Sequence, residues 1–190
     1  MQPIAIQTKS LNLTDEQFFR LCGENRDLRF ERDKNKNILI MSPTGYFTGN
    51  FNAEILYEVA KWNKKNRDGF VFDSSTGFTL PNTSVRSPDV SWIEKSRAEK
   101  ISQVDKEKFA HICPDFVIEI FSKTDSLKDL TEKMEEWIEN GCQLAWLINP
   151  YTKTTSVFMP NAEIESVSFE NSLSGKNILP GFELVISQIL

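Results

Sequence analysis

The sequence is poor in the residues on which many enzyme nucleophiles and zinc sites depend. It has one histidine, His111, and three scattered cysteines, Cys22, Cys113 and Cys142. An odd and scattered set of cysteines argues against a disulfide framework and against a four-ligand zinc site. Serine, cysteine and phosphohistidine mechanisms usually need a histidine as base or nucleophile, so a lone His111 is a weak candidate for catalysis.

Long apolar runs and an excess of positive charge are also missing. No run approaches the length of a transmembrane helix, and no basic and then apolar leader follows Met1. These absences predict a soluble, cytoplasmic protein without membrane contact. The formal net charge of −5 gives no support to non-specific phosphate binding. Proteins that hold a metal with carboxylates are themselves acidic, so this charge neither proves nor excludes a nucleic acid partner.

What the chain does have is an ordinary globular composition, with 39% hydrophobic and 26% charged residues. A chain of 190 residues can bury one sizeable core, so we expect a single domain over residues 1–190. Two strand patterns, at 28–31 and 38–41, flank the polar residues 33–37 and predict an N-terminal hairpin.

Helices and strands are expected to alternate along the rest of the chain. The apolar spacing and capping signals predict helices over residues 14–23, 50–63 and 124–141. Strands are expected at 70–72, 78–80, 89–93, 116–120 and 144–148, with edge strands at 155–159 and 166–169. Residues 94–111 are expected to form a helix or a mobile excursion. The strand, helix and strand between Phe116 and Ile148 predict a βαβ unit with parallel, adjacent strands.

Two carboxylates interrupt these apolar strand patterns. Asp89 follows Pro88 at the start of one apolar run, and Glu119 lies inside another, Phe116 to Ile120. Burying an ionised carboxylate costs several kcal/mol unless a cation or strong donors compensate it. The two acids together predict a shared bound ion.

A lysine on the following helix extends this set. At 100° per residue, Lys133 lies about 40° from Trp137 on the apolar stripe of its helix. If the helix packs back on the strand that it follows, Lys133 leans toward Glu119. The three residues then predict a site for phosphodiester cleavage, in which Asp89 and Glu119 bind Mg²⁺. Lys133 either steadies or deprotonates the attacking water.

Magnesium prefers few carboxylates and several waters, and Mn²⁺ is a possible substitute. We expect the backbone carbonyl of Ile120 to complete the protein ligands. Glu54 is a further candidate, either as a direct ligand or through water. A divalent ion is needed because an anionic phosphate repels hydroxide, and the ion offsets the charge that builds in the transition state.

Each of these residues also has an ordinary structural explanation. An aspartate after proline, such as Asp89, commonly accepts backbone hydrogen bonds at a turn. Glu119 can face solvent if its sheet is half covered, and Lys133 can be a surface lysine with a buried stem. Glu54 alone fits a solvated helix residue. The site hypothesis therefore depends on the combination and not on any single residue.

Several segments, in order along nearly the whole chain, resemble the Uma-two family of predicted restriction endonucleases in the PD-(D/E)XK nuclease superfamily. The segments that carry this resemblance are Ile40–Gly45, Asn52–Ile55, Arg86–Val90, Cys113–Ile120, Lys133, Gly141–Pro150 and Leu179–Phe182. The resemblance implies an α/β restriction-endonuclease-like core, with a central mixed β-sheet flanked by helices and an N-terminal hairpin. The ordered set is more specific than any one motif.

The resemblance also implies roles for individual residues. Asp89 matches the motif aspartate, Glu119 the second acid and Glu54 the first-helix glutamate. The superfamily usually places a lysine two residues after the second acid, where this chain has Phe121. The family moves that lysine to the following helix, at Lys133, with Lys123 and Lys128 as weaker candidates.

Two further departures from the family pattern are visible. Lys34 follows Asp33 where the family often has glycine, which concerns the geometry of the hairpin. No histidine follows Ser42-Pro43, which removes an accessory contact.

Three functions are compatible with these features. The leading hypothesis is a Mg²⁺-dependent endonuclease that acts on DNA, with homodimerisation expected because related nucleases often cut two strands with two copies. The alternative is a catalytically silent nuclease fold that binds nucleic acid or a protein partner. A structural or toxin-like element of a mobile gene is a third.

Overall fold

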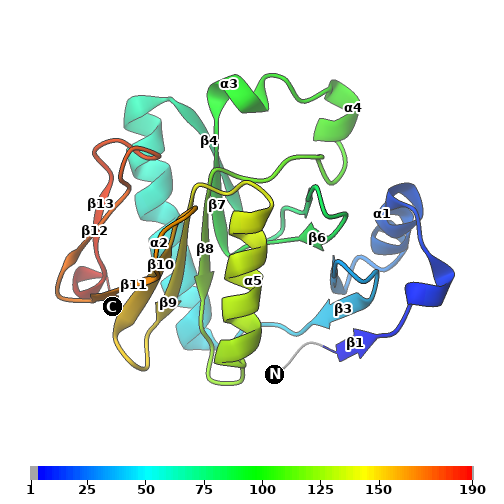
Figure 1. Ribbon diagram of the computed structural model, residues 1–190, viewed down its shortest axis with the longest axis horizontal. Helices are drawn as coiled ribbons and strands as arrows, with labels where there is room; N and C mark the ends of the chain where they lie inside the picture. Colours follow the sequence, from blue (N-terminus) through cyan, green and yellow to red (C-terminus); the bar gives the residue numbers. More distant parts are fainter. Residues whose placement is uncertain (1–3, 190) are drawn as a thin grey trace.

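A six-stranded mixed sheet lies at the centre of the fold, seen here in a computed structural model that describes residues 4–189 (Figure 1). In sheet order, its strands are β11 (Glu165–Ser168), β10 (Thr154–Phe158), β9 (Leu144–Asn149), β8 (Phe116–Ile120), β7 (Val90–Glu94) and β4 (Gly69–Asp73). Strands β8 and β9 pair in parallel, and the other neighbours are antiparallel. The predicted parallel, adjacent pair is confirmed.

Two long helices cover the two faces of this sheet. The first is α2 (Tyr46–Asn66) and the second is α5 (Leu127–Glu139). Alternate residues of β8 explain the layering, since Phe116 and Ile118 belong to the core that α2 covers, whereas Val117 belongs to the core that α5 covers. Every residue of β8 is buried, as its continuous apolar pattern predicted.

A second, five-stranded sheet is built mainly from the N-terminal part of the chain and lies beside α5 in Figure 1. Its order is β1 (Ile4–Ile6), β3 (Ile38–Met41), β2 (Arg29–Arg32), β6 (Val85–Arg86) and β5 (Phe78–Thr79). Strands β2 and β3 form the predicted hairpin. The Asp33 carboxylate closes its loop by accepting hydrogen bonds from the backbone N–H groups of Asn35 and Asn37, both at 2.8 Å.

Shorter elements complete the described chain. Helix α1 (Asp15–Glu24) begins with the predicted capping box between Thr14 and Gln17. The remaining elements are η1 (Lys9–Leu11), α3 (Lys95–Ala98), α4 (Gln103–Lys106), β12 (Ser172–Ser174), β13 (Glu183–Val185) and η2 (Ile186–Gln188). Strands β12 and β13 form a small separate sheet. None of the helices in residues 4–189 has the length and apolar character needed to cross a bilayer.

Several sequence-based boundaries differ from the structure. Helix α2 begins at Tyr46, four residues before the predicted start, because no proline follows its N-cap, Gly45, and the helix tolerates Gly49 in its first turn. The strand predicted at 155–159 was expected to lie at an edge, but β10 pairs on both sides, with β9 and β11. Residues 94–111 form two short helices, each only four residues long. Strand β7 begins at Val90, so Asp89 immediately precedes it.

Candidate active site

The pairing of β7 with β8 brings the two predicted acids to one end of the central sheet. Val90 pairs with Ile118 in an antiparallel register, and the next position of that register places Asp89 opposite Glu119. Asp89 Oδ2 accepts a hydrogen bond from the backbone N–H of Ile120 at 2.8 Å. Asp89 Oδ1 accepts one from Asn52 Nδ2 at 3.0 Å, so α2 also holds this carboxylate. The half-buried Asp89 is therefore fixed by the end of β8 and by α2.

Glu119 is held from the other side of the sheet by α5. Its side chain is 5% exposed, and its Oε1 accepts a hydrogen bond from Trp137 Nε1 at 3.2 Å. Lys133 Nζ lies 2.8 Å from the same oxygen. Both contacts use Oε1, and Oε2 makes no hydrogen bond within residues 4–189. This second oxygen is the atom of Glu119 that remains open to a ligand.

Lys133 has the position that the phase of its helix predicted, next to Glu119. Its ammonium group also lies 3.0 Å from Glu31 Oε1, so two carboxylates share one cation. Burial disfavours the charged lysine, but the charges of Glu119 and Glu31 outweigh it and raise the pKa of Lys133 well above its ordinary value. Lys133 is therefore an ammonium ion at neutral pH, which favours the role of steadying charge over the role of a base.

The two acids of the pair carry more negative charge than their surroundings compensate. Burial raises the pKa of Glu119 to about 7; Lys133 opposes this shift and the negative charge of Asp89 adds to it. Burial also raises the pKa of Asp89, although the N–H of Ile120 and the ammonium of Lys133 lower it in part. A bound cation would relieve both effects.

The structure also shows residues that the sequence interpretation missed. Glu31 on β2 is 3% exposed and accepts from Arg86 Nη1 and from the backbone N–H of Ser87, both at 3.0 Å. Arg86 in turn lies 2.6 Å from the buried carboxylate of Glu136 on α5. Lys133 and Glu136 are three residues apart on α5, so one face of the helix carries both charges toward the N-terminal sheet.

Within residues 4–189, no hydrogen bond or ion pair joins Glu54 to Asp89 or Glu119. Its side chain is exposed on α2, and Asn52, two residues earlier, is the helix residue that contacts Asp89. Two residues correspond to a rotation of about 200° around a helix, so Asn52 and Glu54 point to nearly opposite sides. Lys123 and Lys128 are exposed, and Lys128 pairs with Glu132 at 3.8 Å.

The oxygen atoms of Asp89, Glu119 and Ile120 are the donors at this end of the sheet that could bind a divalent metal ion. Within residues 4–189, no group of three or more histidine, cysteine, aspartate or glutamate side chains is arranged to hold a metal. Magnesium sites, however, commonly use only one or two carboxylates and keep several waters. Two buried, under-compensated acids fit that requirement, since no hydrogen bond within residues 4–189 occupies Oε2 of Glu119, and the carbonyl of Ile120 stands at the same strand end.

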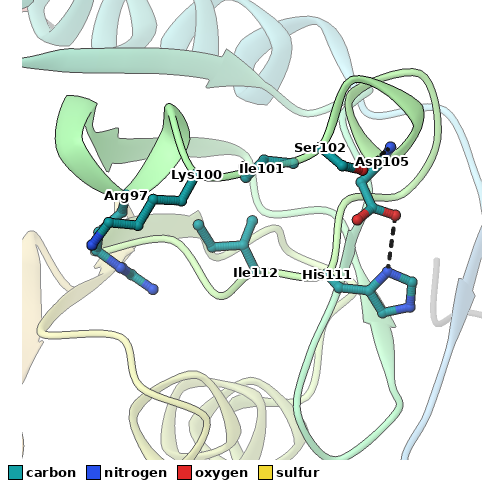
Figure 2. Close-up of a pocket in the computed structure, with 7 residues that line it drawn as sticks. All are labelled: Arg97, Lys100, Ile101, Ser102, Asp105, His111 and Ile112. Atoms are coloured by element: carbon teal, nitrogen blue, oxygen red, sulfur yellow. Dashed lines mark hydrogen bonds and ion pairs between the residues drawn. The ribbon is translucent and has the colours of Figure 1, made fainter.

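A pocket of about 310 Å³ lies elsewhere, beside α3 and α4 (Figure 2). Its lining residues are Arg97, Lys100, Ile101, Ser102, Asp105, His111 and Ile112. His111 is exposed here and bridges Asp15 Oδ2 at 3.0 Å and Asp105 Oδ1 at 3.4 Å, which links α1 to α4. Asp89, Glu119 and Lys133 do not line this pocket. The contacts of His111 with Asp15 and Asp105 connect two surface elements, which is a structural role.

Comparison with known proteins agrees with this description. A crystal structure from Anabaena variabilis, titled as a putative nuclease belonging to DUF820, matches with a TM-score of 0.77 and 22% identity, covering 93% of this chain and 97% of that chain. This likeness shows a shared fold, and it confirms the predicted mixed α/β class with helices on both faces of a central sheet. The comparison with curated proteins finds no match.

The sequence pattern of one family covers most of the chain. The Uma2 pattern, described as "Putative restriction endonuclease", matches residues 15–187, which include Asp89, Glu119 and Lys133. The family match supports a nuclease role. The chain belongs to the Uma2 family.

Proposed function

We propose that this protein is an endonuclease that hydrolyses phosphodiester bonds in DNA with the help of Mg²⁺, for which Mn²⁺ can substitute. Restriction-endonuclease-like families generally use divalent metal ions, which supports the general class of mechanism. The observation that carries the proposal is the uncompensated pair of Asp89 and Glu119 beside the ammonium of Lys133. Two buried carboxylates with raised pKa values and one shared cation are the kind of group that occurs at functional sites, and a bound dication would balance their charge.

Asp89 and Glu119 would hold the metal together with the carbonyl of Ile120. When bound, the metal supplies positive charge that offsets the developing charge on the phosphate oxygens and favours an attacking hydroxide. Asn52 and the N–H of Ile120 fix the orientation of the Asp89 carboxylate. Trp137 fixes Glu119 through Oε1, which leaves Oε2 directed to a ligand.

Lys133 contributes a fixed positive charge to the same place. Since its pKa is raised, it stays protonated and can donate hydrogen bonds to a phosphate oxygen or to the attacking water. The side chain is 12% exposed, so the charge acts in a partly dehydrated environment where it is stronger than in bulk water. The protein groups thus orient the reactants and stabilise charge.

Three expectations about the whole protein belong to this proposal. Residues 1–190 form one domain, the protein acts in the cytoplasm, and two copies associate so that each cuts one strand of a duplex. Glu54 is retained as a residue that contacts a water or the substrate from the exposed side of α2.

The decisive experiment is a cleavage assay on supercoiled plasmid, linear duplex and RNA, with Mg²⁺, Mn²⁺ or EDTA. We expect metal-dependent nicking or cutting of DNA by the wild-type protein. Asp89→Asn and Glu119→Gln should each reduce the rate by about 10³-fold or more, as expected when charge stabilisation at the reacting phosphate is lost. Full activity in both variants, or in EDTA, would refute the proposed mechanism.

Isothermal titration calorimetry with Mg²⁺ separates this function from a silent nuclease fold. Heat of binding that disappears in Asp89→Asn and Glu119→Gln supports the metal site even before a cleavable sequence is known. Nucleic acid binding without any binding of Mg²⁺ or Mn²⁺ would favour the silent fold.

A further inference from the structure

Lys133 is approached by a second carboxylate, Glu31, which comes from the N-terminal hairpin. The two residues are 102 positions apart in the chain, yet Lys133 Nζ lies 3.0 Å from Glu31 Oε1 and 2.8 Å from Glu119 Oε1. Both carboxylates are at least nine-tenths buried. The ammonium group therefore bridges one acid of the proposed metal pair and one acid outside it.

Glu31 differs from the metal pair in how completely its charge is balanced. Glu31 Oε1 accepts hydrogen bonds from Lys133 Nζ and from the backbone N–H of Ser87, and Glu31 Oε2 accepts one from Arg86 Nη1. Burial alone would raise the pKa of Glu31, but the charges of Lys133 and Arg86 reverse this and lower its pKa. Both oxygens are thus occupied by protein donors, which makes Glu31 unsuited to be a metal ligand and suited to hold a cation.

We propose that Glu31 is a positioning residue that keeps the Lys133 ammonium beside the phosphate-binding end of the site; the proposal rests on the proposed nuclease function. Asp89 and Glu119 would hold the dication, and the Glu119 carboxylate that Lys133 contacts would then be neutralised by it. Glu31 then remains as the partner of the lysine and keeps it in place. Without Glu31, a largely dehydrated ammonium would be left facing a metal ion, and its flexible stem would carry it toward solvent.

The support behind Glu31 makes this arrangement rigid. Arg86 lies between Glu31 and Glu136, at 3.0 Å from the first and 2.6 Å from the second. Asn82 Nδ2 donates to the remaining oxygen of Glu136 at 2.8 Å. The chain of contacts runs from the hairpin to α5 and back to the residues before β7, so Glu31 is itself held by several elements.

The test uses Glu31→Gln and Glu31→Asp in the full-length protein, with Asp115→Asn as a matched control. Asp115 is also nearly buried and also accepts from an arginine, Arg97, and from a backbone N–H, that of Glu94 at 2.8 Å. It precedes β8 at the end of the strand away from Glu119. The control removes a comparable buried ion pair without touching Lys133.

The first measurement does not depend on nuclease activity. The acetylation rate of Lys133 by acetic anhydride, followed by mass spectrometry across pH, reports its pKa and accessibility. We expect Glu31→Gln to acetylate Lys133 several times faster than the wild type and at lower pH, Glu31→Asp to restore much of the protection, and Asp115→Asn to leave it unchanged. Unchanged protection in Glu31→Gln would overturn the proposal.

The second pair of measurements compares cleavage with metal affinity. Glu31→Gln should lower the turnover rate by about 10- to 100-fold, the usual cost of removing a group that orients a functional residue. Calorimetric Mg²⁺ affinity should fall far less than in Asp89→Asn. A loss of affinity equal to that of Asp89→Asn would make Glu31 a ligand and overturn the positioning role.

The two proposals fail in different ways. A wild-type protein that cleaves no nucleic acid with Mg²⁺ or Mn²⁺ refutes the proposed function, while the acetylation result still decides whether Glu31 holds Lys133. Normal turnover in Glu31→Gln, with a wild-type protein that cleaves, overturns the positioning role alone.

Discussion

The two ends of strand β8 each bury a carboxylate, and they do so in opposite ways. Asp115, just before the strand, is 7% exposed, and its oxygens accept from Arg97 and from the N–H of Glu94. Glu119, near the other end, is 5% exposed, but both of its contacts use one oxygen and its one cation is shared with Glu31. The two carboxylates are thus buried to a similar degree, but the charge of Asp115 is balanced and the charge of Glu119 is not.

This difference distinguishes a structural acid from a candidate functional acid. A fully paired buried carboxylate stabilises the fold only as long as its partner remains. A buried carboxylate whose charge is not fully compensated destabilises the fold until a cation binds. Proteins retain such a cost mainly at sites of binding or catalysis. The contrast between Asp115 and Glu119 leads to four measurable expectations.

The largest effect on stability is expected at Asp115, the carboxylate whose charge is balanced. Asp115→Asn leaves Arg97 without its carboxylate; because the Arg97 side chain is 35% exposed, we expect the free energy of unfolding to fall by about 3 kcal/mol, the lower end of the cost of breaking a buried pair. Glu119→Gln should leave the metal-free protein equally stable or more stable, because it removes an unbalanced charge. Urea titrations monitored by tryptophan fluorescence measure both values. A greater loss in Glu119→Gln than in Asp115→Asn would reverse the comparison.

The pH dependence of stability should come from Glu119, the carboxylate whose charge is not balanced. The folded-state pKa of Glu119, at about 7, lies above its ordinary value of 4.5, so the folded state binds the extra proton more tightly than the unfolded state. The associated stability is complete below about pH 4.5 and is lost as pH rises through about 7, with a total on the order of 3 kcal/mol. Metal-free melting curves from pH 5 to 8 test this, and Glu119→Gln should flatten them.

Divalent metal should stabilise only when the under-compensated pair is intact. At a Mg²⁺ concentration of 100 times the Kd, linkage predicts about 2.7 kcal/mol of added stability. We expect this rise in Tm in the wild type and in Asp115→Asn, and its loss in Asp89→Asn. A melting temperature that does not respond to Mg²⁺ or Mn²⁺ would contradict the proposed metal site.

The smallest effect is expected at the exposed ion pairs of His111. Its hydrogen bond to Asp15 raises the pKa of His111, with Asp105 adding to the shift. The stabilisation is therefore present below the ordinary pKa of about 6.5 and disappears as pH rises through the higher folded value. Because the side chain is 55% exposed, we expect only about 0–1 kcal/mol. The difference in urea midpoint between wild type and His111→Ala, at pH 6 and pH 9, measures it.

Much of the central layer follows from local patterns in the sequence. The continuous apolar run of β8 and the stripe of α5 predicted a parallel βαβ unit, and the helical phase of Lys133 predicted its contact with Glu119. These inferences succeed because strand, helix and strand are contiguous, so short-range periodicity determines which side chains face each other.

The contribution of the N-terminal hairpin could not be found in the same way. Glu31 stands in a short polar strand, Arg29–Arg32, whose pattern is typical of a solvent-facing hairpin. Its burial depends on the packing of β2 against distant elements, and no local periodicity encodes a contact that spans 102 residues. The two-residue strand β6, which carries Arg86, is likewise too short for a periodic signal. Asn52 is uncharged, so the helical pattern alone does not distinguish it from a solvated helix residue, although its side chain contacts Asp89.

The Lys133 to Glu31 contact has a consequence for the newly made protein. Strand β8 and helix α5 can come together from one short stretch of chain, whereas their lysine receives its second anion only after the first hairpin has docked against them. A half-folded molecule would therefore hold the acids without a properly anchored ammonium. Under the proposed function, the site would therefore be complete only in the fully folded protein.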